Sequence, residues 1–179
     1  MRATGVVRRI DDLGRIVIPK EIRRTMRMRE GDPLEIFTGQ GGEIILKKYS
    51  IMAELSEFSQ NYADSLYRVS GLHCVICDTD NVIAYTGAGK KEAIGVQMTK
   101  EMEDLLTQRL SYFKQFANEK PLYTHPRAEL VAVGATPIIA AGDAVGIVAM
   151  VAGEGEILNE TQKKLLVLTA TFLANHLEV

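Results

Sequence analysis

Apolar and polar positions near the N-terminus follow the two-residue spacing of short strands. Residues 4–10 and 15–18 are rich in β-branched side chains, and the sequence DDLG at residues 11–14 separates them. We expect Gly14 to supply the positive φ that such a turn requires. A second pair of strands is predicted at residues 33–38 and 43–49, joined by the sequence GQGG as a hairpin.

A helix of about two turns is predicted between the two strand pairs, at residues 19–26. Pro19 suits the first helical position because its missing N–H would have no partner there. Helical spacing places Ile22 and Met26 on the inner side, and it leaves Arg23, Arg24 and Arg27 on the outer side.

The N-terminal strands carry apolar side chains on both faces. In the strand at residues 15–18, Ile16 and Ile18 lie on one face and Val17 lies on the other. Strands of this kind need cover on both faces, and about 50 residues cannot supply it from a single copy. We therefore expect an obligate dimer with interleaved strands.

The rest of the chain predicts helices around a sheet. A helix at residues 51–69 is ended by Ser70-Gly71, and strands follow at residues 73–78 and 82–85. After a loop at residues 86–95, a helix capped by Thr99 extends to about residue 117. Two more strands lie at residues 130–140 and 144–151, and the last helix runs from Asn159, with Gln162 completing a capping box, to about residue 177. The apolar positions assigned to the first of these helices are Ile51, Leu55, Phe58, Tyr62, Leu66 and Val69.

The C-terminal helix has two apolar stripes, whereas a helix lying on one sheet needs only one. One stripe contains Leu165, Leu168 and Phe172, and the other contains Leu166, Ala170, Leu173 and Leu177. The second stripe predicts a further partner, and packing against the same helix pair of another chain would form a four-helix bundle. We expect substitution of Leu173 or Leu177 by Asp to break such a tetramer into dimers.

Charge divides the chain of 179 residues into two parts. Residues 1–50 hold 11 Lys+Arg against 7 Asp+Glu, whereas residues 51–179 hold 10 against 16. A basic head on an acidic body predicts that only the head meets a polyanion. No apolar stretch approaches the roughly 18 residues of a membrane span. We expect a cytoplasmic protein without membrane partners, in which both cysteines stay reduced.

The segment TGVVRRIDDLGRIVIPKEIRRT, followed by EGDPLEIF and GEIILKKY, resembles the swapped-hairpin DNA-binding domain of the AbrB family of transition-state regulators. The resemblance covers residues 1–50 and implies that two chains interleave into a small β-barrel. It also implies that Arg8, Arg15, Arg23 and Arg24 contact double-stranded DNA, with Arg9, Lys20 and Arg2 as phosphate contacts. For Arg27 and Arg29 the alternative of a solvated surface stays open.

Residues 51–179 resemble a GAF domain, a sheet flanked by helices, in element order and length. The whole chain is thus a mixed α+β protein. It resembles late, forespore-stage sporulation regulators that join these two domains, form tetramers and both activate and repress genes. This implies a nucleoid-associated protein of the forespore. Two alternatives remain: a pleiotropic AbrB-like repressor without a sporulation role, and a small-molecule sensor that acts through protein contacts.

No residue pattern predicts catalysis or metal binding. Cys74 and Cys77 have C-x-x-C spacing, but they lie in a predicted strand, where an offset of three places them on opposite faces. The sequence GAGKK at residues 87–91 departs from the phosphate-loop pattern, and His125 and His176 are interpreted as surface or satisfied histidines. We expect no enzyme activity, no metal and no identified cofactor.

A small-molecule ligand between the sheet and a flanking helix remains an open alternative. The residues considered for such a cavity are Tyr85, Met98, Met102, Phe113 and Tyr123, and the interpretation that they are ordinary core is preferred.

Overall fold

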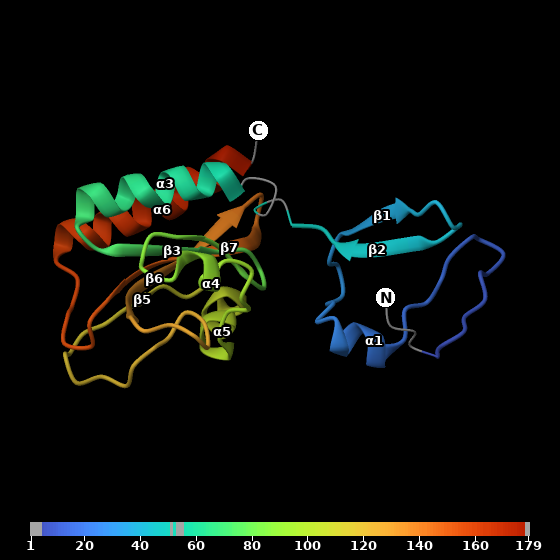
Figure 1. Ribbon diagram of the computed structural model, residues 1–179, viewed down its shortest axis with the longest axis horizontal. Helices are drawn as coiled ribbons and strands as arrows, with labels where there is room; N and C mark the ends of the chain where they lie inside the picture. The colour runs from blue at the N-terminus through green and yellow to red at the C-terminus, as the bar shows by residue number, and fades with distance from the viewer. Residues whose placement is uncertain (1–4, 51, 53–55, 178–179) are drawn as a thin grey trace. The chain divides into compact units, whose positions relative to one another are not determined.

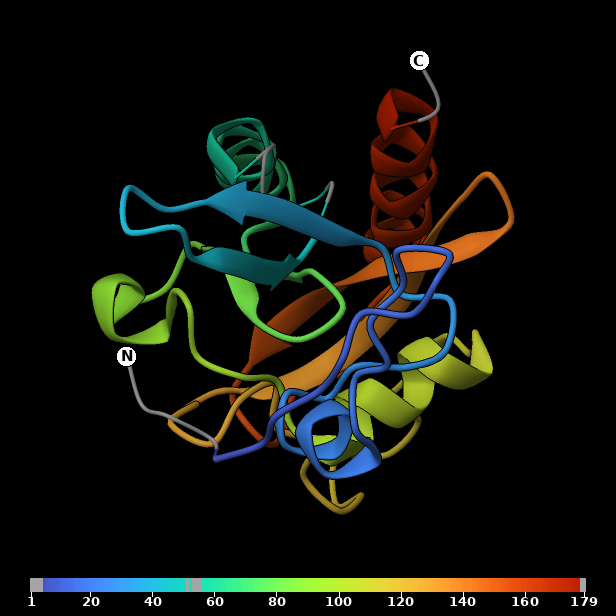
Figure 2. The ribbon, with the colours of Figure 1, turned by 90° about the vertical axis from the view of Figure 1, so that its right-hand side faces the viewer.

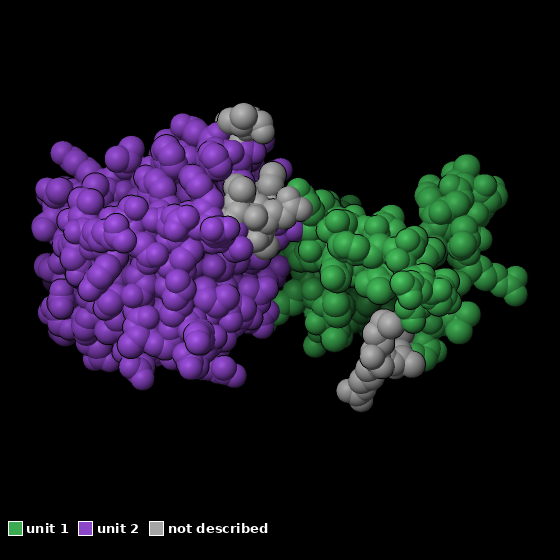
Figure 3. All heavy atoms as spheres, turned by 45° about the horizontal axis from the view of Figure 1, so that its top comes forward, with its two compact units in different colours: residues 1–49 green, residues 50–179 purple. Residues whose placement is uncertain are grey.

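The computed structural model describes residues 5–50, 52 and 56–177. The chain forms two compact units, Met1–Tyr49 and Ser50–Val179, which are coloured separately in Figure 3. We refer to them as the head and the tail. No helix in the described ranges is both long and apolar enough to cross a bilayer.

Within residues 5–49, the head contains one short helix and one hairpin (Figure 1). Helix α1 spans Lys20–Thr25, directly after Pro19, as the fixed φ of proline favours. Strands β1 (Leu34–Thr38) and β2 (Ile44–Lys48) pair antiparallel, with Leu34 opposite Lys48 and Thr38 opposite Ile44. Both elements lie within the residues predicted for them.

The strands predicted at residues 4–10 and 15–18 are not formed in the single chain. Residue 4 lies outside the described residues, and residues 5–10 and 15–18 are assigned to no strand. They run as a ribbon joined at its turn by a hydrogen bond from the Asp11 N–H to the Arg15 carbonyl, 3.0 Å long. A strand requires a paired neighbour, and extended segments that lack one in their own chain remain unassigned.

The head has almost no core of its own. Val7 is 89% exposed and Val17 is 72% exposed, and Met26, predicted to point inward, is also exposed. α1 has no buried residue. The other exposed large apolar side chains of the head are Val6, Ile10, Leu13, Ile16, Ile36, Ile44 and Leu46. The head is a small unit, and much of its apolar surface is not covered within the chain.

The tail is built on a five-stranded antiparallel sheet in the order β4-β3-β7-β6-β5. The strands are β3 (His73–Cys77), β4 (Val82–Tyr85), β5 (Tyr112–Phe113), β6 (Val131–Ala140) and β7 (Asp143–Ala152). The long hairpin of β6 and β7 forms the centre, and Gly142 in its turn has a φ of +86°.

Helices cover both faces of this sheet (Figure 2). Helices α3 (Ser56–Ser70) and α6 (Glu160–Leu177) lie side by side on one face, and the short helices α4 (Lys90–Ala93) and α5 (Lys100–Gln108) lie on the other. Leu166 and Leu173 of α6 pack on the first face, and Met102 and Leu106 of α5 pack on the second. The result is a three-layered domain with two apolar cores.

The predicted helix boundaries are confirmed where local signals set them. The Thr99 hydroxyl accepts a hydrogen bond from the Met102 N–H at 3.3 Å. Asn159 and Gln162 form the reciprocal capping box, with bonds of 2.9 and 3.0 Å. Gly71 follows α3 with a φ of +74°.

Other boundaries differ from the prediction. α5 ends at Gln108 rather than near residue 117, because Arg109 adopts a left-handed conformation with a φ of 57° and the chain then turns into β5. The loop at residues 86–95 contains α4. Val69, predicted to be inward, is 71% exposed, and Ile51 and Leu55 lie outside the described residues.

Candidate nucleic-acid interface and assembly surface

The turn at residues 11–15 presents one of the predicted DNA-contacting arginines. The Asp11 carboxylate accepts hydrogen bonds from the Leu13 and Arg15 backbone N–H groups at 3.0 and 2.8 Å. The Arg15 Nε donates to the same carboxylate at 2.8 Å. These bonds to Arg15 and Leu13 lower the pKa of Asp11, and Gly14 has the predicted positive φ, +75°. The loop is therefore ordered by its own side chains, with Arg15 at its end.

Three more of the predicted cationic residues share α1. Lys20, Arg23 and Arg24 are all exposed, and their spacing of three and four residues places them on neighbouring positions of the helix surface. The last turn of a helix favours cations, so Arg23 and Arg24 are also compatible with the dipole of α1.

Arg8 and Arg9 lie on the ribbon before the turn and are likewise exposed, whereas Arg2 lies outside the described residues. In residues 5–50, Arg8, Arg9, Lys20, Arg23 and Arg24 make no ion pair with a described carboxylate. Their charges are therefore not neutralised by partners in the described part of the head. Arg15 is the exception, because Asp11 pairs with it.

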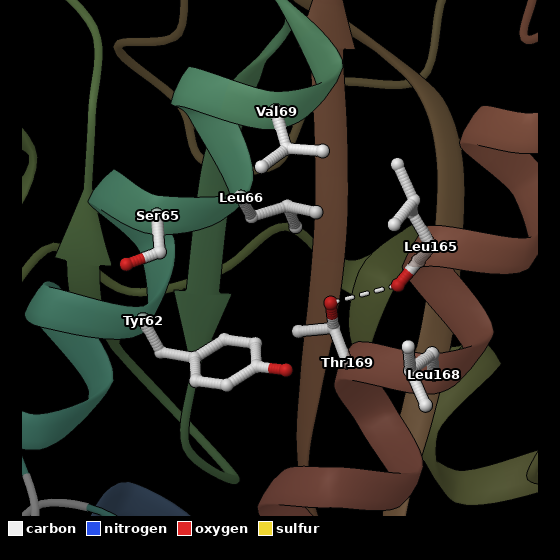
Figure 4. Close-up of a pocket in the computed structure, with 7 residues that line it drawn as sticks. All are labelled: Tyr62, Ser65, Leu66, Val69, Leu165, Leu168 and Thr169. Atoms are coloured by element: carbon white, nitrogen blue, oxygen red, sulfur yellow. Dashed lines mark hydrogen bonds between the residues drawn. The ribbon is translucent and has the colours of Figure 1, made fainter.

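The outer surface of the α3–α6 pair is the second candidate site. Tyr62, Leu66 and Val69 of α3 and Leu165 and Leu168 of α6 line a groove of about 200 Å³ (Figure 4). Leu168 is 59% exposed. Further aromatic packing between the helices comes from Tyr62 and Phe172, whose ring centroids are 4.9 Å apart.

The two apolar stripes predicted for α6 differ in burial. Leu166, Ala170 and Leu173 are buried against the sheet, while Leu168 and Phe172 remain exposed. Leu173 is only 2% exposed, so it is a poor choice for disrupting assembly. Its replacement by Asp would place a carboxylate inside the core of the tail.

The cysteines are placed as predicted. Cys74 belongs to the core under α3 and α6, and Cys77 belongs to the core under α5, on opposite faces of β3. Both thiols are free and buried, and burial raises the pKa of each. Neither has the lowered pKa of a reactive cysteine.

Of the residues considered for a ligand cavity, Tyr85, Met98 and Met102 are core. Phe113 is half-buried, Tyr123 is partly exposed, and Tyr85 also lines a cavity. Within the described residues, no group of three or more His, Cys, Asp or Glu side chains could hold a metal ion.

The histidine predictions are partly wrong. His176 is exposed and stacks on Phe58, with ring centroids 4.1 Å apart. His125, however, is 3% exposed, and neither ring nitrogen has a hydrogen-bond partner among the described residues. The sequence around His125 does not predict this burial, because it depends on where the loop that carries His125 packs in the tertiary structure.

Comparisons with known proteins match both units. A family model described as "Stage V sporulation protein T C-terminal, transcription factor" matches residues 54–178, and one described as "Antidote-toxin recognition MazE, bacterial antitoxin" matches residues 7–52. Stage V sporulation protein T of Bacillus subtilis is 44% identical over 178 residues, which cover 99% of both chains. The B. subtilis transition state regulatory protein AbrB is 55% identical over 49 residues, 27% of this chain and 50% of AbrB.

The tail also resembles solved GAF domains. One from a phosphoenolpyruvate-protein phosphotransferase of Coxiella burnetii superposes with a TM-score of 0.56 at 16% identity, covering 70% of this chain and 86% of that one. This similarity confirms the predicted GAF fold of the tail. Because one relative matches nearly the whole chain and the family model covers most of the tail, the protein belongs to the stage V sporulation protein T family of transcription factors.

Proposed function

We propose that this protein regulates transcription by binding double-stranded DNA through the basic surface of its head. The residues that would make the contacts are Arg8, Arg9, Arg15, Lys20, Arg23 and Arg24, with Arg2 as a further phosphate contact. The observation that carries the proposal is the exposure of the six cations at positions 8 to 24, five of them without a described carboxylate partner, in the one unit with positive net charge.

The chemistry of these side chains suits DNA. A guanidinium group binds a phosphate, or the O6 and N7 atoms of guanine, through two parallel hydrogen bonds. The acidic tail, with 16 Asp+Glu against 10 Lys+Arg in residues 51–179, would be repelled by the same phosphates. The head therefore provides the DNA contacts, and the tail serves in regulation and assembly rather than in catalysis.

The exposed apolar side chains of the head support a dimer. Val7, Val17 and Ile36 would be covered if the ribbon at residues 5–18 paired with a second copy, which would also complete its strands. Two-fold symmetry then doubles each arginine across a pseudo-palindromic site. We extend the proposal to a swapped head dimer.

The α3–α6 surface supports a second level of assembly. Two such helix pairs, each presenting Leu168 and Phe172, would pack as a four-helix bundle and join two head dimers into a tetramer. Joined dimers bind bivalently, and avidity then exceeds that of one dimer by about 100-fold or more where the spacing fits the DNA. As the resemblance to sporulation regulators implies, such a tetramer would act on forespore genes as activator and repressor.

Fluorescence anisotropy with labelled duplex DNA tests the head. Each Arg→Ala change at position 8, 15, 23 or 24 should weaken binding by about 1–3 kcal/mol where the arginine reads a base, and by less where it holds phosphate. The logarithm of the binding constant should fall with that of salt by about 0.9 per neutralised phosphate.

The matched control is Arg68→Ala, which removes an exposed arginine from the tail helix α3. It should leave the affinity and the salt slope unchanged. The quadruple variant combines the Arg→Ala changes at positions 8, 15, 23 and 24. If circular dichroism shows that this variant is folded and it still binds DNA with wild-type affinity, the head serves only for dimerisation. The protein would then act through protein contacts instead.

A further inference from the structure

A cavity of about 580 Å³ lies at the end of the tail sheet where β3 begins and β4 ends. The pairing of β3 with β7, and of β7 with β6, brings the start of β6 to the same end. Tyr85 of β4, Ala93 of α4 and Leu130 before β6 give the cavity an apolar lining. No lining residue belongs to α3 or α6, so this cavity is separate from the proposed assembly surface.

His125 is the feature that distinguishes this cavity from a void between packed side chains. Its ring lines the cavity and is almost fully buried, and neither of its nitrogens has a partner among the described residues. The Tyr85 ring contacts it edge-on, with centroids 6.1 Å apart and planes at 89°. Buried polar groups are nearly always hydrogen-bonded, so an unpaired imidazole that lines a cavity points to a ligand that pairs with it.

The charge around His125 limits what that ligand can be. Burial lowers the pKa of His125, and the positive charge of Arg127 lowers it further. The imidazole is therefore neutral near pH 7, with one N–H donor and one acceptor. Arg127 lines the same cavity, and a guanidinium beside an imidazole N–H is suited to a carboxylate.

Two carboxylates, Glu92 and Glu129, also line the cavity. Burial raises the pKa of Tyr85, and the negative charge of Glu129 raises it further, which places Glu129 near the apolar lining. A ligand with only negative charge would be repelled by both glutamates, and one with only positive charge would be repelled by Arg127. A molecule that carries one negative and one positive charge can pair with Arg127 and with the two glutamates.

We propose that this cavity binds a small zwitterion, an α-amino acid or a molecule of similar size with one carboxylate and one ammonium group. The carboxylate accepts hydrogen bonds from His125 and Arg127, and the ammonium group faces Glu129 and Glu92. The remainder of the molecule lies against Tyr85 and its apolar neighbours. The volume is within the range of about 300–1,000 Å³ that is usual for small-molecule sites. The proposal does not depend on DNA binding by the head.

The proposal is tested by thermal unfolding of the full chain in the presence of each standard L-amino acid. Each amino acid that raises Tm is then titrated by calorimetry. A ligand that binds only the folded state raises Tm. We expect at least one amino acid to do so. Acetate, which offers only the carboxylate, and ethylamine, which offers only the ammonium group, should each bind about tenfold or more weakly. No response to any amino acid, or equal binding of acetate, would overturn the proposal.

Three substitutions locate the site. Arg127→Gln and Glu129→Gln change exposed side chains, and His125→Phe keeps the ring and removes its nitrogens. Each substitution should lower the affinity for the amino acid by about tenfold or more. Arg68→Gln on α3 is the matched control and should bind normally. Should His125→Phe fail to fold, the two exposed substitutions decide, and unchanged affinity in both contradicts the assignment.

Discussion

Replacement of Leu168 by Asp should separate the proposed tetramer into dimers without unfolding the tail. Leu168 lies on α6 beside the groove shared with α3, and 59% of it is exposed in the single chain. Little of the tail core therefore depends on this side chain. The substitution therefore acts mainly on the proposed interface that covers Leu168 in the tetramer.

The magnitude follows from the exposed fraction. Complete burial of a leucine side chain stabilises by about 1.5–3 kcal/mol, so covering the exposed part of Leu168 contributes about 1–2 kcal/mol per copy. A four-helix bundle made from two chains contains this position twice, and its loss removes about 2–4 kcal/mol. Association of the two tails in one bundle should then weaken roughly 30- to 700-fold, before the cost of burying two carboxylates is counted.

Analytical ultracentrifugation of the full chain at micromolar concentration measures this change. Leu110→Asp is the matched control, because Leu110 is a leucine of similar exposure, 52%, that follows α5 on the other side of the sheet. We expect the wild type and Leu110→Asp to sediment as tetramers and Leu168→Asp to sediment as a dimer. A wild-type dimer, or a tetramer in Leu168→Asp, would refute the reasoning.

Three further predictions concern single elements. Replacing Cys74 and Cys77 by Ala should leave DNA affinity, measured by anisotropy, equal under oxidising and reducing conditions, because burial raises the pKa of both thiols; redox-sensitive binding lost in the double variant would contradict this. The pKa of Asp11 is lowered in the folded turn. The stabilisation of the turn by the Asp11 carboxylate is therefore complete above about pH 4, and it is lost as the pH falls through the pKa of the folded state. Amide signals of Leu13 and Arg15 should titrate below pH 4 in the wild type and not in Asp11→Asn. Asn159→Ala should lower the tail's unfolding free energy by about 0.5–2 kcal/mol in chemical denaturation, because it removes the cap of α6, and an unchanged midpoint would argue against that role.

Local chemistry made several features predictable from the sequence. The caps at Thr99 and Asn159, and the turn at Gly14, depend on residues within a few positions of each other. Their hydrogen bonds form with the backbone nearby, whatever the rest of the chain does. The arginines of the proposed DNA surface were also predicted from the sequence, because charge and a motif resemblance need no tertiary contacts.

The tertiary structure decided which surfaces are covered. The stripes of α6 are equally apolar in sequence, and only the position of the sheet determined that Leu173 is buried and Leu168 is not. α5 ends at Gln108 because the next residue, Arg109, adopts a left-handed conformation although it is not a glycine, and no local sequence pattern predicts this. His125 was assigned to the surface or to a satisfied site, yet the loop that carries it folds over the end of the sheet. Burial arises from contacts between segments distant in sequence, so the composition around a single residue does not determine it.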